Sequence, residues 1–277
     1  MHAMKLQTLL VLLVALFAGA AWAAAPTLHS KSVLVIDETT GKVLHERNAD
    51  ALLSIASITK LMTAIVVLDA KLPLDERVTI VNADVQASRK TRSLLDVGLA
   101  FTREDLIDFA LIASDNRAAA ALARAYPGGA DAFINAMNQK AKVLGLKHTA
   151  FVDSSGLAVS NVSTARELAT LVRAAHQYPL IRQFSSARAH DFVFIKGLPA
   201  TTYDNSNALT REAGWNISLS KTGYIRDAGW CLVMMTRIDD KPVLIVQMGA
   251  PQSHHRLDDA RALRRWIEGG ASPAGKL

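Results

Sequence analysis

Segments with strand character lie at both ends of this chain, and helical segments lie between them. Residues 32–37 and 42–46 are aliphatic and β-branched runs around a turn that ends in Gly41, which predicts a hairpin. Further strands are expected at residues 216–219, 229–236 and 243–248. Because strands from the two ends can then share one sheet, the pattern predicts an α+β fold in which an antiparallel sheet is interrupted by a helical lobe. No long linker interrupts residues 26–277, so we expect a single domain with the lobe at about residues 80–190.

The middle of the chain repeats apolar residues at the spacing of a helix. In residues 57–68 they recur every three or four positions, which predicts a helix with one buried face. Thr102 and Asp105 give a capping signal for a second helix. Thr164 and Glu167 give the same signal for a later one. Helices are expected at residues 106–112, 117–126, 130–144, 168–176 and 255–268.

The first residues have the parts of an export signal. Lys5 supplies a basic start, residues 9–18 are an unbroken apolar run, and small residues follow as far as Ala25. Ten apolar residues fall short of the roughly 20 that span a bilayer, so we expect cleavage after Ala23 or Ala25. Residues 1–25 are therefore interpreted as a signal peptide. We expect a mature protein in the periplasm with no membrane-spanning segment.

Composition excludes several other classes of protein. The 277 residues are 50% hydrophobic and 20% charged, so the chain can bury a large core. Cys231 is the single cysteine, which excludes an intrachain disulfide and a multi-cysteine zinc site. His254 and His255 lack a third ligand at a suitable spacing, and we expect no metal and no cofactor. The net charge of +6 comes without a dense basic block or a nucleic-acid motif, so no nucleic-acid partner is expected.

Three short motifs occur in order along the chain: Ser57-Ile-Thr-Lys60, Ser114-Asp-Asn116 and Lys221-Thr-Gly223. Each is weak alone, but their settings add weight. Ser57 and Lys60 stand at the start of an expected helix, where a spacing of three puts both side chains on one face. The unpaired N–H groups and partial positive charge of a helix N-terminus also suit a developing oxyanion.

This arrangement fits a nucleophilic serine with a lysine base. A free lysine has a pKa of about 10.4, but burial and a neighbouring cation can lower it to about 7–8, where it accepts a serine proton. Lys221 could supply that second cation. Ser57 would then attack a carbonyl, with Lys60 as general base, and the resulting acyl-enzyme would hydrolyse.

The other two motifs suit substrate binding and proton delivery. Ser114 could relay a proton to the leaving amine, and Asn116 would orient the lysine base and a substrate amide. Lys221 and Thr222 on a strand edge could bind a substrate carboxylate. Gly223 would allow the substrate backbone to approach closely.

With these motifs the chain resembles the penicillin-recognising serine D,D-peptidases, the low-molecular-mass penicillin-binding proteins. The segments around the motifs also resemble this family, at residues 56–63, 151–157, 163–165, 205–207 and 221–229 and at Asn161. The resemblance covers the chain from about Lys31 to the last expected helix. It implies a five-stranded antiparallel sheet flanked by helices, with an inserted all-helical lobe.

The same resemblance implies further site residues and ligands. The backbone N–H groups of Ser57 and Tyr224 would form an oxyanion hole. Arg256 stands where related peptidases place an arginine that helps to bind the substrate carboxylate. Peptidoglycan peptides are the expected substrates, and β-lactam antibiotics are the expected acylating inhibitors.

Four functions remain open at this stage. Only 54 residues follow Gly223, fewer than the extra domain of resembling carboxypeptidases needs, which favours a soluble D-alanyl-D-alanine endopeptidase that cleaves murein cross-links. A D-alanyl-D-alanine carboxypeptidase is the first alternative. A β-lactamase is the second: Asp115 is shared with class A enzymes, but the only Glu-x-x-x-Asn string, Glu212 to Asn216, stands in the wrong place. The third is a non-catalytic wall-binding protein.

Overall fold

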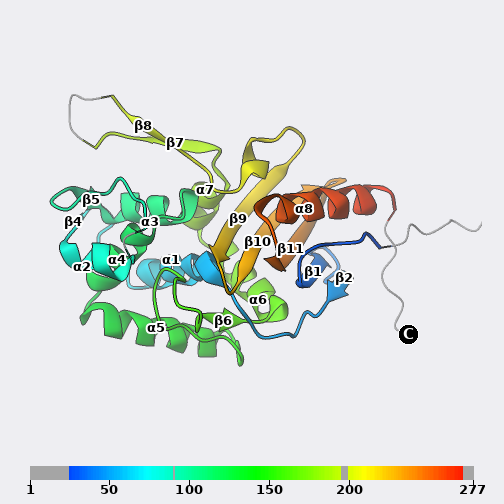
Figure 1. Ribbon diagram of the computed structural model, residues 1–277, viewed down its shortest axis with the longest axis horizontal. Helices are drawn as coiled ribbons and strands as arrows, with labels where there is room; N and C mark the ends of the chain where they lie inside the picture. Colours follow the sequence, from blue (N-terminus) through cyan, green and yellow to red (C-terminus); the bar gives the residue numbers. More distant parts are fainter. Residues whose placement is uncertain (1–24, 90, 195–198, 271–277) are drawn as a thin grey trace, which may run out of the picture.

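The computed structural model describes residues 25–89, 91–194 and 199–270 (Figure 1). Apart from Ala25, the expected signal peptide lies outside these residues. No helix in the described ranges is both long and apolar enough to cross a membrane.

A five-stranded antiparallel sheet joins the two ends of the chain, as the sequence predicts. Its strand order is β2-β1-β11-β10-β9. The strands are β1 (Ser32–Asp37), β2 (Val43–Arg47), β9 (Asn216–Ile225), β10 (Gly229–Ile238) and β11 (Lys241–Ala250). The central pairing sets Leu34 opposite Val246, so the first strand is held by the last one. Strand β9 lies at an edge of the sheet.

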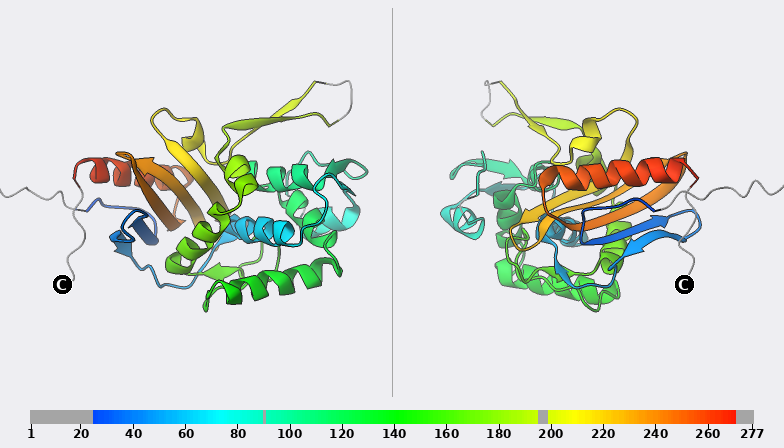
Figure 2. Two further views of the ribbon diagram at one scale, coloured as in Figure 1. Left: turned by 180° about the vertical axis from the view of Figure 1, so that it is seen from behind. Right: turned by 45° about the vertical axis from the view of Figure 1, so that its right-hand side comes forward.

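Helices cover both faces of the sheet (Figures 1 and 2). Successive residues of a strand point to opposite faces, and here both faces are apolar. Val33 belongs to a cluster with α8 (Ser253–Glu268), whereas its neighbour Leu34 belongs to the larger cluster that contains α1 (Thr59–Asp69) and α6 (Ala165–His176). The strands β1, β10 and β11 are therefore largely apolar along their length.

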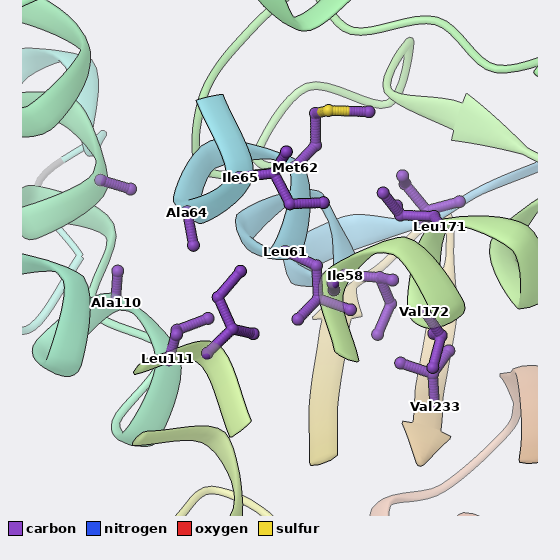
Figure 3. Packing of buried hydrophobic residues seen from close by; sticks show 14 of the residues in the cluster. Ile58, Leu61, Met62, Ala64, Ile65, Ala110, Leu111, Leu171, Val172 and Val233 are labelled. Carbon is purple, nitrogen blue, oxygen red and sulfur yellow. The ribbon is translucent and has the colours of Figure 1, made fainter. Parts of the chain in front are cut away.

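Helix α1 is buried on all sides, so the prediction of a single buried face is wrong. Every residue from Thr59 to Val67 is buried. The reason is its position between the sheet and the helical lobe. Figure 3 shows its apolar side chains between Ala110 and Leu111 of the lobe and Leu171, Val172 and Val233 on the sheet side.

The lobe and its connections contain more elements than the sequence pattern predicts. Its helices are α2 (Asn82–Ala87), α3 (Arg103–Ile112), α4 (Asn116–Arg124), α5 (Gly129–Val143) and α7 (Pro179–Ser186). Short strands pair β3 (Leu53–Ser54) with β6 (Val162–Ser163) and β4 (Arg77–Thr79) with β5 (Ala100–Thr102). A further hairpin, β7 (Ala189–Phe192) with β8 (Thr201–Asp204), projects from the body beside the lobe (Figures 1 and 2).

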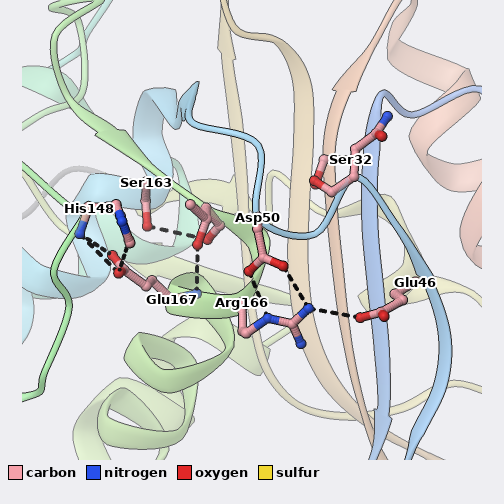
Figure 4. A network of polar contacts seen from close by, with 9 residues as sticks. Ser32, Glu46, Asp50, His148, Ser163, Arg166 and Glu167 are labelled. Carbon is pink, nitrogen blue, oxygen red and sulfur yellow. Dashed lines mark hydrogen bonds and ion pairs between the residues drawn. The ribbon is translucent and has the colours of Figure 1, made fainter.

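A polar network fixes α6 against the N-terminal strands (Figure 4). Arg166 donates to Asp50 at 2.7 Å and to Glu46 at 2.9 Å. The next residue, Glu167, accepts from the backbone and ring of His148, both at 2.9 Å. These contacts join the start of α6 to two segments that are distant in sequence.

Candidate active site

Ser57 and Lys60 lie together at the start of the central helix. Ser57 stands in a 3-10 turn, η1 (Ala56–Ile58), directly before α1, and Lys60 lies in the first turn of α1. Nζ of Lys60 is 2.9 Å from Oγ of Ser57. It also donates to Oδ1 of Asn116 at 2.6 Å and to the carbonyl of Ser155 at 2.7 Å. The first two motifs are thus joined by direct contacts.

Burial lowers the pKa of Lys60 to about 7, although the Asp115 and Asp153 carboxylates raise it. Burial was one of the two causes expected from the sequence and is the dominant one, whereas the second expected cause, the Lys221 cation, is not among the groups that shift this pKa. A neutral lysine amine has two N–H groups and one lone pair. The Asn116 and Ser155 oxygens can accept the two N–H groups, which leaves the lone pair for the Ser57 hydroxyl.

The Ser114-Asp-Asn116 motif forms the bend between α3 and α4. Ser114 has φ +60°, in the left-handed region that non-glycine residues rarely adopt. Asp115 is the N-cap of α4 and accepts from the Ala118 amide at 2.9 Å. Asp115 therefore has a structural role as the cap of α4. Within the described residues the Ser114 hydroxyl makes no hydrogen bond.

The third motif lies on the edge strand β9, packed closely against η1. A Cβ atom on Gly223 would lie 3.1 Å from the Ser57 amide nitrogen and 3.0 Å from the Ile55 carbonyl, which explains why glycine is needed there. Lys221 is buried, and its pKa is lowered well below the usual value, first by burial and then by the Lys60 and Arg256 cations. Its Nζ donates to the Thr222 carbonyl at 3.0 Å.

Several residues outside the expected site also contact these motifs. Oγ1 of Thr222 donates to Oγ of Ser206 at 2.8 Å, and Nδ2 of Asn116 donates to Oγ1 of Thr91 at 3.2 Å. The Ser155 carbonyl contacts the lysine, and Asn161 holds that loop against α1 by donating to Thr59. Ser155, Asn161 and Ser206 lie in segments that resemble the family, and this resemblance could have pointed to them. No sequence feature points to Thr91.

Tyr224 and Arg256 are stacked with Trp230 beside the third motif. The Tyr224 ring, which is 49% exposed, stacks on Trp230 with 4.1 Å between centroids. The Arg256 guanidinium lies 4.8 Å from the centroid of Trp230 and donates to the Cys231 carbonyl at 3.5 Å. The carboxylate-binding role that the family resemblance implies for Arg256 stays a prediction.

Glu212 is not placed to act as the deacylating glutamate of a β-lactamase. The Glu212 carboxylate binds Arg261 at 2.7 Å and lies at the end of η2 (Ala208–Arg211), before β9. Its pKa is lowered, first by that arginine. Across the described ranges, no group of three or more His, Cys, Asp or Glu side chains is arranged to hold a metal ion.

The fold and the three motifs define the class of penicillin-recognising serine D,D-peptidases. Residues 20–252 match the family model described as D-alanyl-D-alanine carboxypeptidase, the S11 peptidases. The chain belongs to this family and is a serine D-Ala-D-Ala peptidase.

Curated relatives of this chain include both endopeptidases and carboxypeptidases. The D-alanyl-D-alanine endopeptidase of Pseudomonas aeruginosa is 47% identical over 88% of this chain and 78% of its own length. The Escherichia coli enzyme of the same name is 45% identical over 93% of this chain and 83% of its own length. The E. coli carboxypeptidase DacC is 34% identical, over 91% of this chain and 65% of that protein.

A solved structure supports the same fold. The Streptomyces K15 DD-transpeptidase is 29% identical, with a TM-score of 0.82 over 90% of this chain and 100% of that one. The predicted α+β fold, with its five-stranded antiparallel sheet and helical lobe, is confirmed.

Proposed function

We propose that this protein is a periplasmic D-alanyl-D-alanine endopeptidase that cleaves murein cross-links through an acyl-enzyme on Ser57. One observation carries the proposal: Nζ of the buried Lys60 lies 2.9 Å from Oγ of Ser57, and the pKa of Lys60 is about 7. A base with this pKa can accept the serine proton at neutral pH. Export depends on residues 1–25 acting as a signal peptide, which the apolar run favours.

In the proposed reaction, Lys60 takes the Ser57 proton while Oγ attacks the carbonyl of the scissile D-alanyl amide. The backbone N–H groups of Ser57 and Tyr224 would hold the oxyanion. As the C–N bond breaks, the proton passes from Lys60 through Ser114 to the leaving nitrogen. A water molecule then attacks the ester, Lys60 accepts its proton, and Ser57 recovers its hydroxyl hydrogen.

Substrate binding is assigned to the groups around β9. Lys221 and Thr222 would bind the carboxylate next to the scissile amide, and Arg256 would contribute to the same site. The close packing of Gly223 on η1 supports the proposed role of the Tyr224 amide, which follows it in the strand. Asn116 would orient the lysine and the acyl-donor amide. Penicillin would acylate the same serine, and its ester would hydrolyse slowly.

Endopeptidase activity is favoured over carboxypeptidase activity by the relatives of highest identity among those compared, although the family description favours the second function. Both reactions can be measured together, with purified cross-linked murein and free pentapeptide as substrates. We expect loss of cross-linked dimers at a rate far above that of D-alanine release from pentapeptide, and neither reaction with Ser57→Ala. D-alanine release with intact dimers would identify a carboxypeptidase. Rapid penicillin hydrolysis without an effect on murein would identify a β-lactamase.

A further inference from the structure

A pocket of about 300 Å³ opens on the Ser114 side of the candidate site. It is lined by Arg92, Ser93, Leu94, Ala113, Ser114, Asp115, Asn116 and Tyr203. Ser57 and Thr222 are not among its lining residues. The walls therefore come from three segments: the loop before β5, the bend between α3 and α4, and strand β8 of the projecting hairpin (Figure 1).

Contacts among these segments hold the pocket in shape. The loop before β5 is joined to α4, because Arg117 donates to the Leu95 carbonyl at 2.6 Å. The Tyr203 ring packs edge-on against Phe109 of α3, with 5.2 Å between centroids, and against Phe192 of β7 at 5.6 Å. A pocket with fixed walls binds a ligand at a lower entropic cost.

Two side chains give this pocket its chemical character. The Tyr203 hydroxyl is buried beside the Leu94 backbone without a hydrogen bond of good geometry, so the ring is the part of Tyr203 that a ligand can contact. Arg92 is exposed and forms no ion pair within the described part of the chain. Asp115 also lines the pocket, but its carboxylate is already bound to the α4 N-terminus and to Ser93.

We propose that this pocket binds the acidic peptide attached to the leaving amine and so gives the enzyme its preference for cross-links. The inference rests on the proposed function. Ser114 delivers a proton to the leaving nitrogen, so the group bonded to that nitrogen lies nearest to the pocket. In a cross-link this group is a peptide with a diamino acid and carboxylates, whereas a carboxypeptidase releases only D-alanine. Arg92 pairs with a carboxylate of the leaving peptide, and the Tyr203 ring packs on its aliphatic part.

The test compares kcat/KM for a cross-linked muropeptide dimer and for a monomeric pentapeptide, with the rate of penicillin acylation measured on the same samples. We expect Arg92→Gln and Tyr203→Ala each to lower the dimer value about tenfold, equivalent to about 1.4 kcal/mol. The pentapeptide value and penicillin acylation should change less than about twofold. Tyr203→Phe restores the ring and should restore dimer cleavage.

Arg265→Gln is the matched control, since it removes an exposed arginine from α8, on the far face of the sheet. Equal losses with both substrates would place the acyl-donor peptide in the pocket and overturn the proposal. An unchanged dimer value for Arg92→Gln and Tyr203→Ala would also overturn it, while leaving the proposed function intact. If wild-type protein cleaved no dimer but was acylated by penicillin, the proposed function would fail, and this inference with it.

Discussion

Nζ of Lys60 lies 2.6 Å from Oδ1 of Asn116, and this contact joins the central helix to the first residue of α4. An amide oxygen stabilises the protonated lysine without contributing a full negative charge. A carboxylate at that distance would raise the pKa of the lysine strongly. The site therefore keeps a buried amine hydrogen-bonded and still able to accept a proton near neutral pH.

The first prediction concerns the pH dependence of acylation. Burial lowers the pKa of Lys60 to about 7, and only the neutral amine can accept the Ser57 proton. We expect the second-order rate constant for penicillin acylation to rise about tenfold per pH unit below the pKa of Lys60 and to level off above it. Mass spectrometry of samples quenched at successive times measures this rate constant at several pH values. Circular dichroism shows whether the protein stays folded. A rate that falls as pH rises would refute the assignment of Lys60 as base.

The second prediction concerns the close packing of β9 on η1. In Gly223→Ala the added methyl group would meet the Ile55 carbonyl at 3.0 Å, which forces the strand away from Ser57. A displacement of this kind misplaces the proposed oxyanion donors, and we expect acylation to slow by about 100-fold. Gly269→Ala is the control, because Gly269 lies at the end of α8 with φ −78°. Acylation of Gly223→Ala at the wild-type rate would contradict this account of the motif.

The third prediction concerns Asn161, which is fully buried and holds the loop of residues 152–161 that carries the Ser155 carbonyl. Its side chain accepts from the Val152 amide at 2.8 Å and donates to the Asp153 carbonyl at 2.9 Å and to Thr59 at 3.0 Å. Asn161→Ala should lower the free energy of unfolding by about 2–4 kcal/mol, because it leaves these groups buried without partners.

Urea unfolding measures this loss, and the exposed Asn82→Ala provides the control, with a change below about 0.5 kcal/mol. Without urea, where Asn161→Ala is folded, its acylation by penicillin should also slow, because the loop carries the Ser155 carbonyl that accepts from Lys60. Equal stability of Asn161→Ala and wild type would show that the network has no net effect.

The fourth prediction concerns the contact between His190 and Asp108 at the base of the projecting hairpin. Nδ1 of His190 lies 2.5 Å from Oδ2 of Asp108, and burial raises the pKa of that carboxyl to about 6. His190→Ala at pH 8 should destabilise the protein by about 2 kcal/mol, because it leaves the Asp108 carboxylate buried and unpaired next to Glu104 and Asp105. The double variant with Asp108→Asn should recover part of the loss in a urea titration. A larger loss in the double variant would argue against an unpaired charge as the cause.

Periodicity and capping predict the main elements of the fold. Thr102 and Thr164 cap α3 and α6 as expected, each accepting from the backbone three residues later. The hairpin β7–β8 was missed because its strands are short and polar in part. It is stabilised by contacts distant in sequence, such as the stacking of Phe192 on Phe109 at 3.9 Å between centroids. A local pattern cannot report such tertiary contacts.

The candidate site was predicted less completely than the fold. The first two motifs contain Ser57, Lys60 and Asn116, which the structure brings into contact. The third ligand of the lysine is a backbone carbonyl, that of Ser155, and any residue type carries such a group. The lowered pKa of Lys60 also depends on the burial of α1 on all sides, whereas the pattern of residues 57–68 predicts only one buried face.

The most direct test of the central claim is the intact mass of the protein after incubation with a labelled penicillin. We expect one covalent adduct on wild-type protein, located on Ser57, and none on Ser57→Ala. Lys60→Met, which keeps the volume of the side chain but removes the amine, should acylate far more slowly. No adduct on folded wild-type protein, or an adduct that survives Ser57→Ala, would contradict the acyl-enzyme mechanism.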